Sequence, residues 1–377
     1  MPHTPDTSDA PEDDDGLERV RAPQPVYYAE QALLGALLLE PRRLADTGTL
    51  TAGHFYNHSH AALFTAIRTL PAPEPADHAK DTAWLTKVLE HARPKARGLS
   101  ASYLHGLIQF CPQAKHAAAY ARMIRADHAR RTLRLHAERL AHTAADTTGP
   151  NPTAATLIQA DALGRVLDDL AGQFAPHPGS LPRTPPITAV ARHGSEEDLD
   201  EERCLLATAT AYPAEVQQMR WLAAEDFIWP LHAKLWQCVT TLVHRGDMVD
   251  PVTVLGEAQL RGLITDALTA RDLMALVSTP AGSPEYWGEN VLRRALLARA
   301  HTVATRITAY TDDLANTPHQ LVTGSRRALA DLNALRTRWH HATSPVPATR
   351  PARARATAAP RAGPPPTTAP PAARLSR

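Results

Sequence analysis

Residues 30–64 read EQALLGALLLEPRRLADTGTLTAGHFYNHSHAALF, and residues 202–236 read ERCLLATATAYPAEVQQMRWLAAEDFIWPLHAKLW. Aligned without a gap, the two segments share ten identities in 35 positions. The identical pairs include Glu30 with Glu202, Leu33 with Leu205, Leu34 with Leu206, Phe55 with Phe227, and His60 with His232. The match resumes where Ile124 and Arg125 correspond to Leu292 and Arg293. An ordered series of this kind indicates a tandem duplication, with copies at residues 26–174 and 198–343.

Both copies have the patterns of helices. Residues 29–39 are rich in Ala and Leu, which favour helices, and the segment ends before Pro41, whose ring excludes the preceding residue from the helical region. Residues 58–70 repeat apolar positions at helical spacing. The candidate core residues of the two copies are Leu33, Leu34, Phe55, His60, Phe64, Leu205, Leu206, Phe227, His232 and Trp236.

Each copy ends in two further helices. Long helices are predicted at about 117–143 and 286–311, and each is followed by a helix that starts after a Pro, at 153–173 and 318–339. A short polar turn between two such helices favours an antiparallel hairpin. No alternating strand pattern stands out. We therefore expect an all-α fold of two tandem helical-bundle domains, each ending in an antiparallel helical hairpin.

The remaining segments differ in composition from the two copies. Residues 1–25 carry seven acidic and two basic side chains, and residues 344–377 carry six Arg and no acid among many Pro and Ala. Neither end has enough large apolar side chains to form a core, so we expect both to be disordered. The Pro-rich residues 175–197 are predicted to be an extended, semi-stiff linker.

Composition excludes several classes of protein. The chain has 377 residues, a formal net charge of +1 and three Cys. This Cys content is too low for a disulfide framework. There is no apolar run of membrane-spanning length, and the acidic N-terminus does not match a secretory leader. We expect a cytoplasmic protein.

The residues of the first copy resemble the N-terminal domain of the DnaB-type replicative DNA helicases. The resemblance rests on AEQALLGALL at 29–38, FYNHSHAALF at 55–64 and YARMIR at 120–125, and it is weaker over the second copy, with VDPVTV at 249–254. In that family this domain forms the helicase collar. The resemblance implies that the hairpin pairs protomers and that the domain contacts primase and helicase loaders. It also implies that ATP hydrolysis resides in a separate RecA-like domain.

The chain lacks the motif of that motor. It contains no Gly-x-x-x-x-Gly-Lys-[Ser/Thr], and no Gly-Lys pair at all. Without a backbone nest and a Lys to bind phosphates, a P-loop ATPase is excluded in this chain. We therefore expect no catalytic residues, no cofactor and no enzymatic activity.

Other candidate sites have simple structural interpretations. His54, His58 and His60 are spaced so that a metal site could be considered, but only His60 recurs in the second copy, so we interpret it as a structural, hydrogen-bonded residue. Cys111, Cys204 and Cys238 have no CxxC spacing, and no metal is expected. Glu30 and Glu202 are interpreted as acids that stabilise the dipole of the helix they begin.

Arginine is the residue type that could carry a function, because its planar guanidinium suits carboxylate and phosphate binding. The candidate interaction residues are Arg122, Arg125, Arg130, Arg131, Arg134, Arg293, Arg294 and Arg299. Acidic neighbours on the same helices leave two interpretations open: a solvated or protein-pairing face, and a direct contact with nucleic acid. The basic tail could bind DNA weakly.

These patterns favour a non-catalytic protein-interaction module of DNA replication that binds a helicase, a primase or a loader. One alternative is a nucleic-acid-binding accessory protein that uses its Arg-rich helices and basic tail, and another is a decayed helicase paralogue. We also expect the two hairpins to pair within one chain, giving a monomeric pseudo-dimer with its Arg-bearing faces free. Met123, Ile124 and Leu133 are the candidates for covering the second hairpin.

Overall fold

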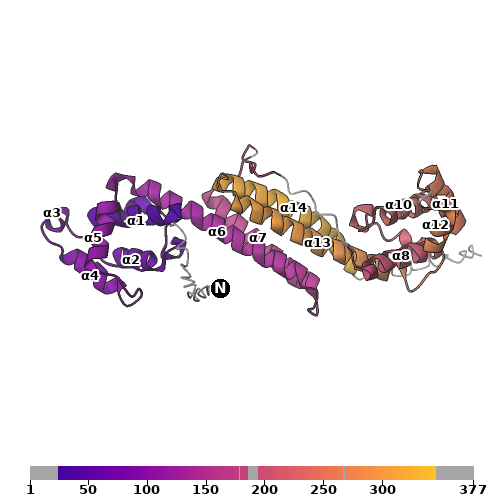
Figure 1. Ribbon diagram of the computed structural model, residues 1–377, viewed down its shortest axis with the longest axis horizontal. Coiled ribbons are helices and arrows are strands. Elements are labelled where there is room, and N and C mark those ends of the chain that lie inside the picture. The colour runs from indigo at the N-terminus through magenta and orange to yellow at the C-terminus, as the bar shows by residue number, and fades with distance from the viewer. Residues whose placement is uncertain (1–23, 178, 186–193, 266–267, 345–377) are drawn as a thin grey trace, which may run out of the picture.

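The computed structural model describes residues 24–177, 179–185, 194–265 and 268–344. The segments expected to be disordered fall almost wholly on residues 1–23 and 345–377, which lie outside the described residues. The described chain is elongated, with a helical head at each end of a central helical bundle (Figure 1). It forms no strand, only an isolated bridge between Thr265 and Leu268, so the predicted all-α class is confirmed. None of the described helices is long and apolar enough to cross a membrane.

The first head is built around one apolar helix. Its elements are α1 (Pro25–Leu39), η1 (Pro41–Thr47), η2 (Ala52–His54), α2 (His58–Thr69), α3 (Pro75–His78), α4 (Ala83–Ala92), α5 (Ala101–Phe110) and η3 (Ala114–His116). α1 is buried on almost every side, which its continuous Ala and Leu run permits. Gly35 allows α5 to cross it closely, because a Cβ there would lie 2.1 Å from the Leu107 carbonyl oxygen.

The second head repeats this plan with α8 (Glu196–Ala211), α9 (Pro213–Val216), η4 (Ala224–Asp226), α10 (Pro230–Arg245), α11 (Pro251–Leu260) and α12 (Ala270–Val277). Phe55 packs on Phe64 in the first head, and Phe227 packs on Trp236 in the second. The structure buries all ten candidate core residues, five in each head.

The two hairpins form the central bundle. They consist of α6 (Ala117–Ala145) with α7 (Pro152–Gln173), and α13 (Pro284–Asp312) with α14 (Pro318–Thr343). α6 packs along α13 and α7 packs along α14, so each layer contains one helix from each half of the chain. The α6 stripe is Ala129, Leu133, Ala137, Leu140 and Ala144, at the three- and four-residue spacing of a helix seam. This stripe belongs to a core shared with α13, α14 and the second head.

The first head has a core of its own, and this corrects part of the expected pairing. Leu133 lies in the shared bundle core as expected, whereas Ile124 belongs to the core of the first head and Met123 is 50% exposed. The reason is the length of α6: its first turns cover α1, and only its later turns reach the second hairpin.

The first part of the linker is docked on the second hairpin. Arg183 donates its backbone N–H to Asn316 Oδ1 at 2.8 Å, and Thr184 donates its hydroxyl to Asp313 at 2.8 Å. Gln320 donates its side-chain amide to the Leu181 carbonyl at 3.0 Å. The described residues before 186 therefore follow the α13–α14 turn rather than spanning freely between the halves.

Candidate interaction surfaces

A buried Glu–His pair fixes the first head. The Glu30 carboxylate is fully buried and accepts hydrogen bonds from the backbone N–H groups of Tyr56 and Asn57 and from Nδ1 of His60, the last at 2.7 Å. His60 Nε2 lies 2.7 Å from the Tyr103 hydroxyl. Glu30 thus binds the backbone at the start of α2 and does not act on the N-terminus of its own helix, α1. The expected role at the dipole of its own helix is replaced by this cross-helix contact.

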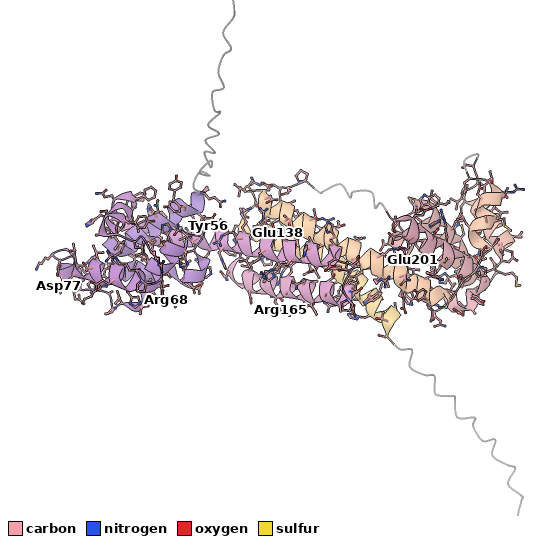
Figure 2. The ribbon with its side chains drawn as sticks, turned by 60° about the horizontal axis from the view of Figure 1, so that its bottom comes forward. Tyr56, Arg68, Asp77, Glu138, Arg165 and Glu201 are labelled. Atoms are coloured by element: carbon pink, nitrogen blue, oxygen red, sulfur yellow. The ribbon has the colours of Figure 1, made fainter. Side chains whose placement is uncertain are left out.

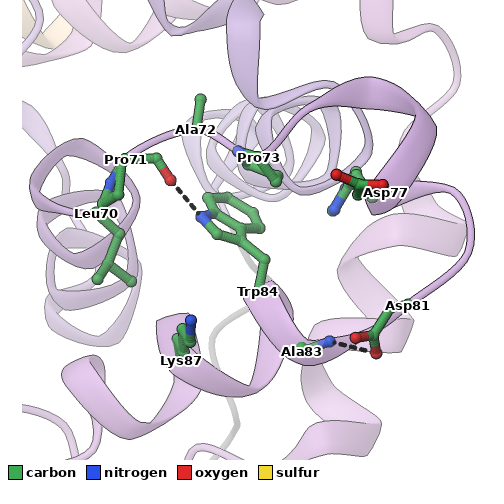
Figure 3. A pocket seen from close by; sticks show the side chains of 10 residues that line it. Leu70, Pro71, Ala72, Pro73, Asp77, Asp81, Ala83, Trp84 and Lys87 are labelled. Carbon is green, nitrogen blue, oxygen red and sulfur yellow. Dashed lines mark hydrogen bonds between the residues drawn. The ribbon is translucent and has the colours of Figure 1, made fainter.

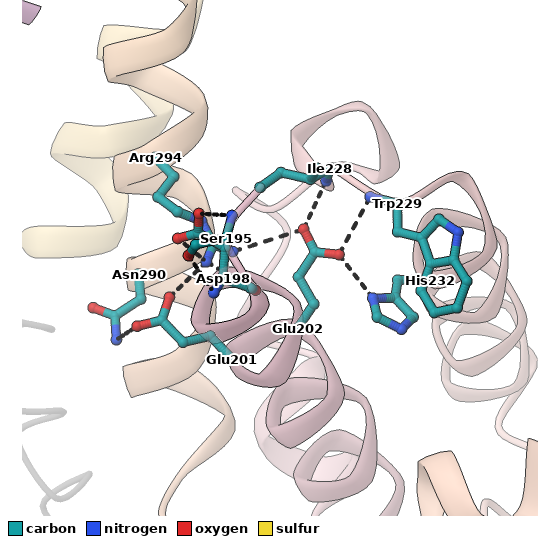
Figure 4. A network of polar contacts seen from close by, with 9 residues as sticks. All are labelled: Ser195, Asp198, Glu201, Glu202, Ile228, Trp229, His232, Asn290 and Arg294. Carbon is teal, nitrogen blue, oxygen red and sulfur yellow. Dashed lines mark hydrogen bonds and ion pairs between the residues drawn. The ribbon is translucent and has the colours of Figure 1, made fainter. Parts of the chain in front are cut away.

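The second head repeats the arrangement (Figure 4). Glu202 accepts from the N–H groups of Ile228 at 2.6 Å and Trp229 at 3.4 Å, and from Nδ1 of His232 at 2.8 Å. A buried carboxylate that satisfies several donors is held firmly in place, and its loss would leave those donors unpaired. The two Glu–His pairs, Glu30 with His60 and Glu202 with His232, are fully buried. They therefore stabilise the heads and do not form a binding site.

Arg294 joins the second head to the bundle. Its guanidinium donates to the carboxylate of Glu201 at 2.7 Å and to the carboxylate and backbone carbonyl of Asp198 at 3.0 and 2.9 Å. Figure 4 shows Arg294 reaching from α13 to the acidic start of α8. This candidate interaction residue is therefore engaged within the chain.

Three candidate arginines of α6 are engaged in the same way. Arg130 donates to the backbone carbonyls of the α13–α14 turn. Arg131 binds Asp127 at 2.7 Å and the His54 carbonyl at 2.8 Å. Arg134 binds Glu138 at 2.7 Å and also Asp312 of the second half. The sequence pointed to free faces at these positions, but these contacts occupy their guanidinium groups.

The other four candidates lie in two separate places. Arg122 is exposed, whereas Arg125, Arg293 and Arg299 are half-buried. Arg122, Arg293 and Arg299 have no hydrogen-bond or ion-pair partner among the described residues, while Arg125 makes one 3.5 Å contact with Thr49. α6 begins at the first head and α13 begins at the second, so the structure does not bring the two groups together. Figure 2 shows how far apart the two heads lie: Asp77 and Arg68 mark one end of the molecule, Glu138 and Arg165 the bundle, and Glu201 the other end.

The histidines considered for a metal point to different places. His54 lies beside His128, with ring centroids 4.5 Å apart, and His58 Nε2 contacts the Lys95 carbonyl at 2.8 Å, whereas His60 is buried with Glu30. The described residues contain no group of three His, Cys, Asp or Glu side chains that could hold a metal ion.

The first head has a hollow of about 400 Å³ lined by the segment after α2, by α3 and by α4 (Figure 3). Trp84 is one of its lining residues and donates its indole N–H to the Pro71 carbonyl at 3.0 Å. Asp77, Asp81 and Lys87 also line it, so its charged side chains are of both signs.

Reasoning from the sequence missed a set of ion pairs between α7 and α14. Asp161 binds Arg336, and Asp168 binds Arg326. A signal was available, because the acidic side chains of the predicted helix at 153–173 outnumber its single Arg, whereas the helix at 318–339 carries four Arg and one acid. Comparing the charge of corresponding helices would have identified the contact.

The comparisons with known proteins concern mainly the two heads. A family model described as the DnaB-like helicase N terminal domain matches residues 22–126 and 195–289, together more than half of the chain. The replicative DNA helicase DnaB of Mycobacterium leprae (strain TN) is 30% identical over 147 residues, which are 38% of this chain and 23% of that protein. The chain thus covers less than a quarter of that relative. No solved structure gives a significant match.

Both segments matched by the family model cover a head and end within the first turns of α6 or α13. The chain belongs to the family of DnaB-like helicase N-terminal domains, whose model it matches twice.

Proposed function

We propose that this chain is a non-catalytic protein-interaction module of DNA replication that binds a helicase, a primase or a loader through its heads. One observation carries the proposal: two heads of the collar-domain family lie at opposite ends of a bundle in which their hairpins are paired with each other. The surfaces by which family hairpins would pair with other protomers are thereby occupied within the chain. The outer faces of the heads remain for a partner.

The two heads offer different surfaces to a partner. Residues 24–116 carry seven acidic and nine basic side chains, whereas residues 195–283 carry fourteen acidic and six basic ones. A strongly acidic head attracts a basic protein surface and repels a nucleic-acid backbone. The charge of the second head therefore favours the protein partner over the alternative of a nucleic-acid-binding accessory protein.

The test uses the purified full chain against the purified helicase, primase and loader of the same organism, each titrated by interferometry. We expect saturable binding of one of them. A second titration uses duplex and single-stranded DNA over a range of salt, because phosphate contacts give a steep linear dependence of log K on log salt. Binding of DNA with a steep slope, with no binding of any of the three proteins, would replace this proposal by the nucleic-acid one.

A further inference from the structure

In the ion pairs between α7 and α14, each copy of the repeat supplies one sign of charge. The Asp161 carboxylate accepts hydrogen bonds from both Nη atoms of Arg336, with the Nη2–Oδ2 distance at 3.1 Å. The Asp168 carboxylate accepts one from Nη2 of Arg326. Both acids lie on the first-copy helix and both arginines on the second-copy helix. The later Asp pairs with the earlier Arg, so the two helices run antiparallel.

The repeat shows what a pair of identical hairpins would bring together. α7 and α14 both begin at a Pro, Pro152 and Pro318, so corresponding residues are 166 positions apart. The counterparts of Arg336 and Arg326 on α7 are Leu170 and Ala160. In an α7–α7 pair of the same register, Asp161 of one helix would therefore lie near Asp168 of the other, since these two residues, seven positions apart, share a face of α7.

The same argument applies to a pair of second-copy hairpins. The counterpart of Asp161 on α14 is Arg327. In an α14–α14 pair, Arg336 of one helix would face Arg327 of the other, with Arg326 beside it. Two-fold symmetry would place each of these like-charge contacts twice in the interface. Like charges across a helix interface oppose association, and opposite charges select the partner.

The other layer of the bundle is also asymmetric. Arg130 of α6 donates to the backbone carbonyl of Thr311 in the last turn of α13 and to those of Asp313 and Asn316 in the turn that follows. Its counterpart on α13, 168 positions later, is Ala298, whose side chain has no hydrogen-bond donor. A pair of two second-copy hairpins would therefore lack this contact with the turn.

We propose that the first-copy and second-copy hairpins are complementary surfaces that accept each other and reject their own copies. The chain closes on itself or exchanges hairpins with a second chain, but two first-copy hairpins do not pair, and neither do two second-copy hairpins. This inference concerns the hairpins alone and does not depend on which partner the heads bind.

The test reverses the charges in the full-length chain. One variant carries Asp161→Arg and Asp168→Arg, a second carries Arg326→Asp and Arg336→Asp, and a third carries all four changes. We expect the first two to melt at lower temperature than the natural chain and the third to regain most of the loss. Mixing the first two should give a 1:1 complex by light scattering, since each α7 then meets an oppositely charged α14 on the other chain. This complex should be at least about tenfold tighter than the self-association of either variant.

A matched control is Asp169→Arg. It changes the net charge of α7 by the same amount as Asp161→Arg, because each replaces one Asp by one Arg. Asp169 is exposed and has no hydrogen-bond or ion-pair partner among the described residues. We expect Asp169→Arg to leave the melting temperature nearly unchanged and Asp161→Arg to lower it. The proposal is overturned if the fourfold variant is no more stable than the twofold ones, or if mixing yields no complex. Self-association of a single twofold variant as strong as the mixed complex would also overturn it.

Discussion

The guanidinium of Arg130 donates a hydrogen bond of 2.6 Å to the backbone carbonyl of Asn316, 186 residues further along the chain. The same group reaches the carbonyls of Thr311 and Asp313 at 2.8 and 2.9 Å. The last carbonyls of a helix have no partner within it, and the helix dipole favours a cation there. One side chain of the first half therefore caps a helix of the second half.

Replacing this residue should weaken the bundle. We expect Arg130→Ala to lower the free energy of unfolding by about 2–3 kcal/mol, since bonds to charged groups contribute about 1.5–3 kcal/mol each and the carbonyls can partly rehydrate. Urea denaturation measures the change. The control is Arg122→Ala on the exposed start of α6, expected within about 0.5 kcal/mol of the natural chain. Equal effects of the two substitutions would show that the cap does not stabilise the fold.

The two heads should respond alike to loss of their equivalent aromatic residues. Phe55 is 7% exposed and Phe227 is 5% exposed. Truncating either to Ala should cost about 3–5 kcal/mol through lost burial and the cavity left behind. Thermal or chemical denaturation of both variants tests this. A silent Phe227→Ala beside a destabilising Phe55→Ala would mean that the second head does not depend on the same packing.

Acid should destabilise the junction of the first head with α6 through His128. Burial, together with the neighbouring His54 and Arg131, lowers the pKa of His128 to about 4. The folded state thus favours the neutral ring, so this contribution to stability is complete above the unfolded pKa of about 6.5 and is lost as the pH falls toward 4. We expect a loss of roughly 1–2 kcal/mol over that interval, less than the full shift would give, because solvent screens the charge on this half-buried ring.

The measurement compares melting curves between pH 4.5 and pH 7.5 for the natural chain and His128→Gln. The variant should show a smaller fall in stability on acidification, because the titrating ring is gone. His105→Gln, at an exposed position of α5, is the matched control and should retain the natural pH dependence. An unchanged pH dependence in His128→Gln would contradict the assignment to this ring.

The purified chain should neither hydrolyse nucleotides nor unwind DNA. Its sequence contains no Gly-Lys pair and therefore no P-loop that could bind the phosphates of a nucleoside triphosphate. A coupled phosphate-release assay with ATP and GTP, with and without single-stranded DNA, tests this. ATPase activity that persists at constant specific activity through a further purification step would refute it.

The natural chain should be a monomer in solution. The hairpins that would pair between chains already cover each other, and tethering raises their effective concentration to about the millimolar range. Light scattering of the full-length protein at micromolar concentration should give the mass of one chain, 40.9 kDa. A mass of twice that value or more would show that pairing between chains prevails.

The fold could be predicted from the sequence wherever local patterns decide it. Ala and Leu runs, Pro at helix starts and the recurrence of Glu30, Phe55 and His60 are local signals, and they led to the all-α class and the repeated heads. The role of Glu30 was not predictable in this way, because its partners at Tyr56 and Asn57 are brought to it by tertiary packing. Arg130 likewise resembles any solvated helix arginine until the turn at residues 313–317 is placed beside it.

The antiparallel bundle also sets a length. α6 and α13 each have 29 residues, which at 1.5 Å per residue is about 43 Å of helix. The first head sits at the start of α6 and the second at the start of α13, at opposite ends of this stiff strut (Figure 1). Two ligands held by the two heads would be kept apart by a fixed span. If both heads bind partners, as we propose, this geometry would suit two sites that lie apart better than one small site held from both sides.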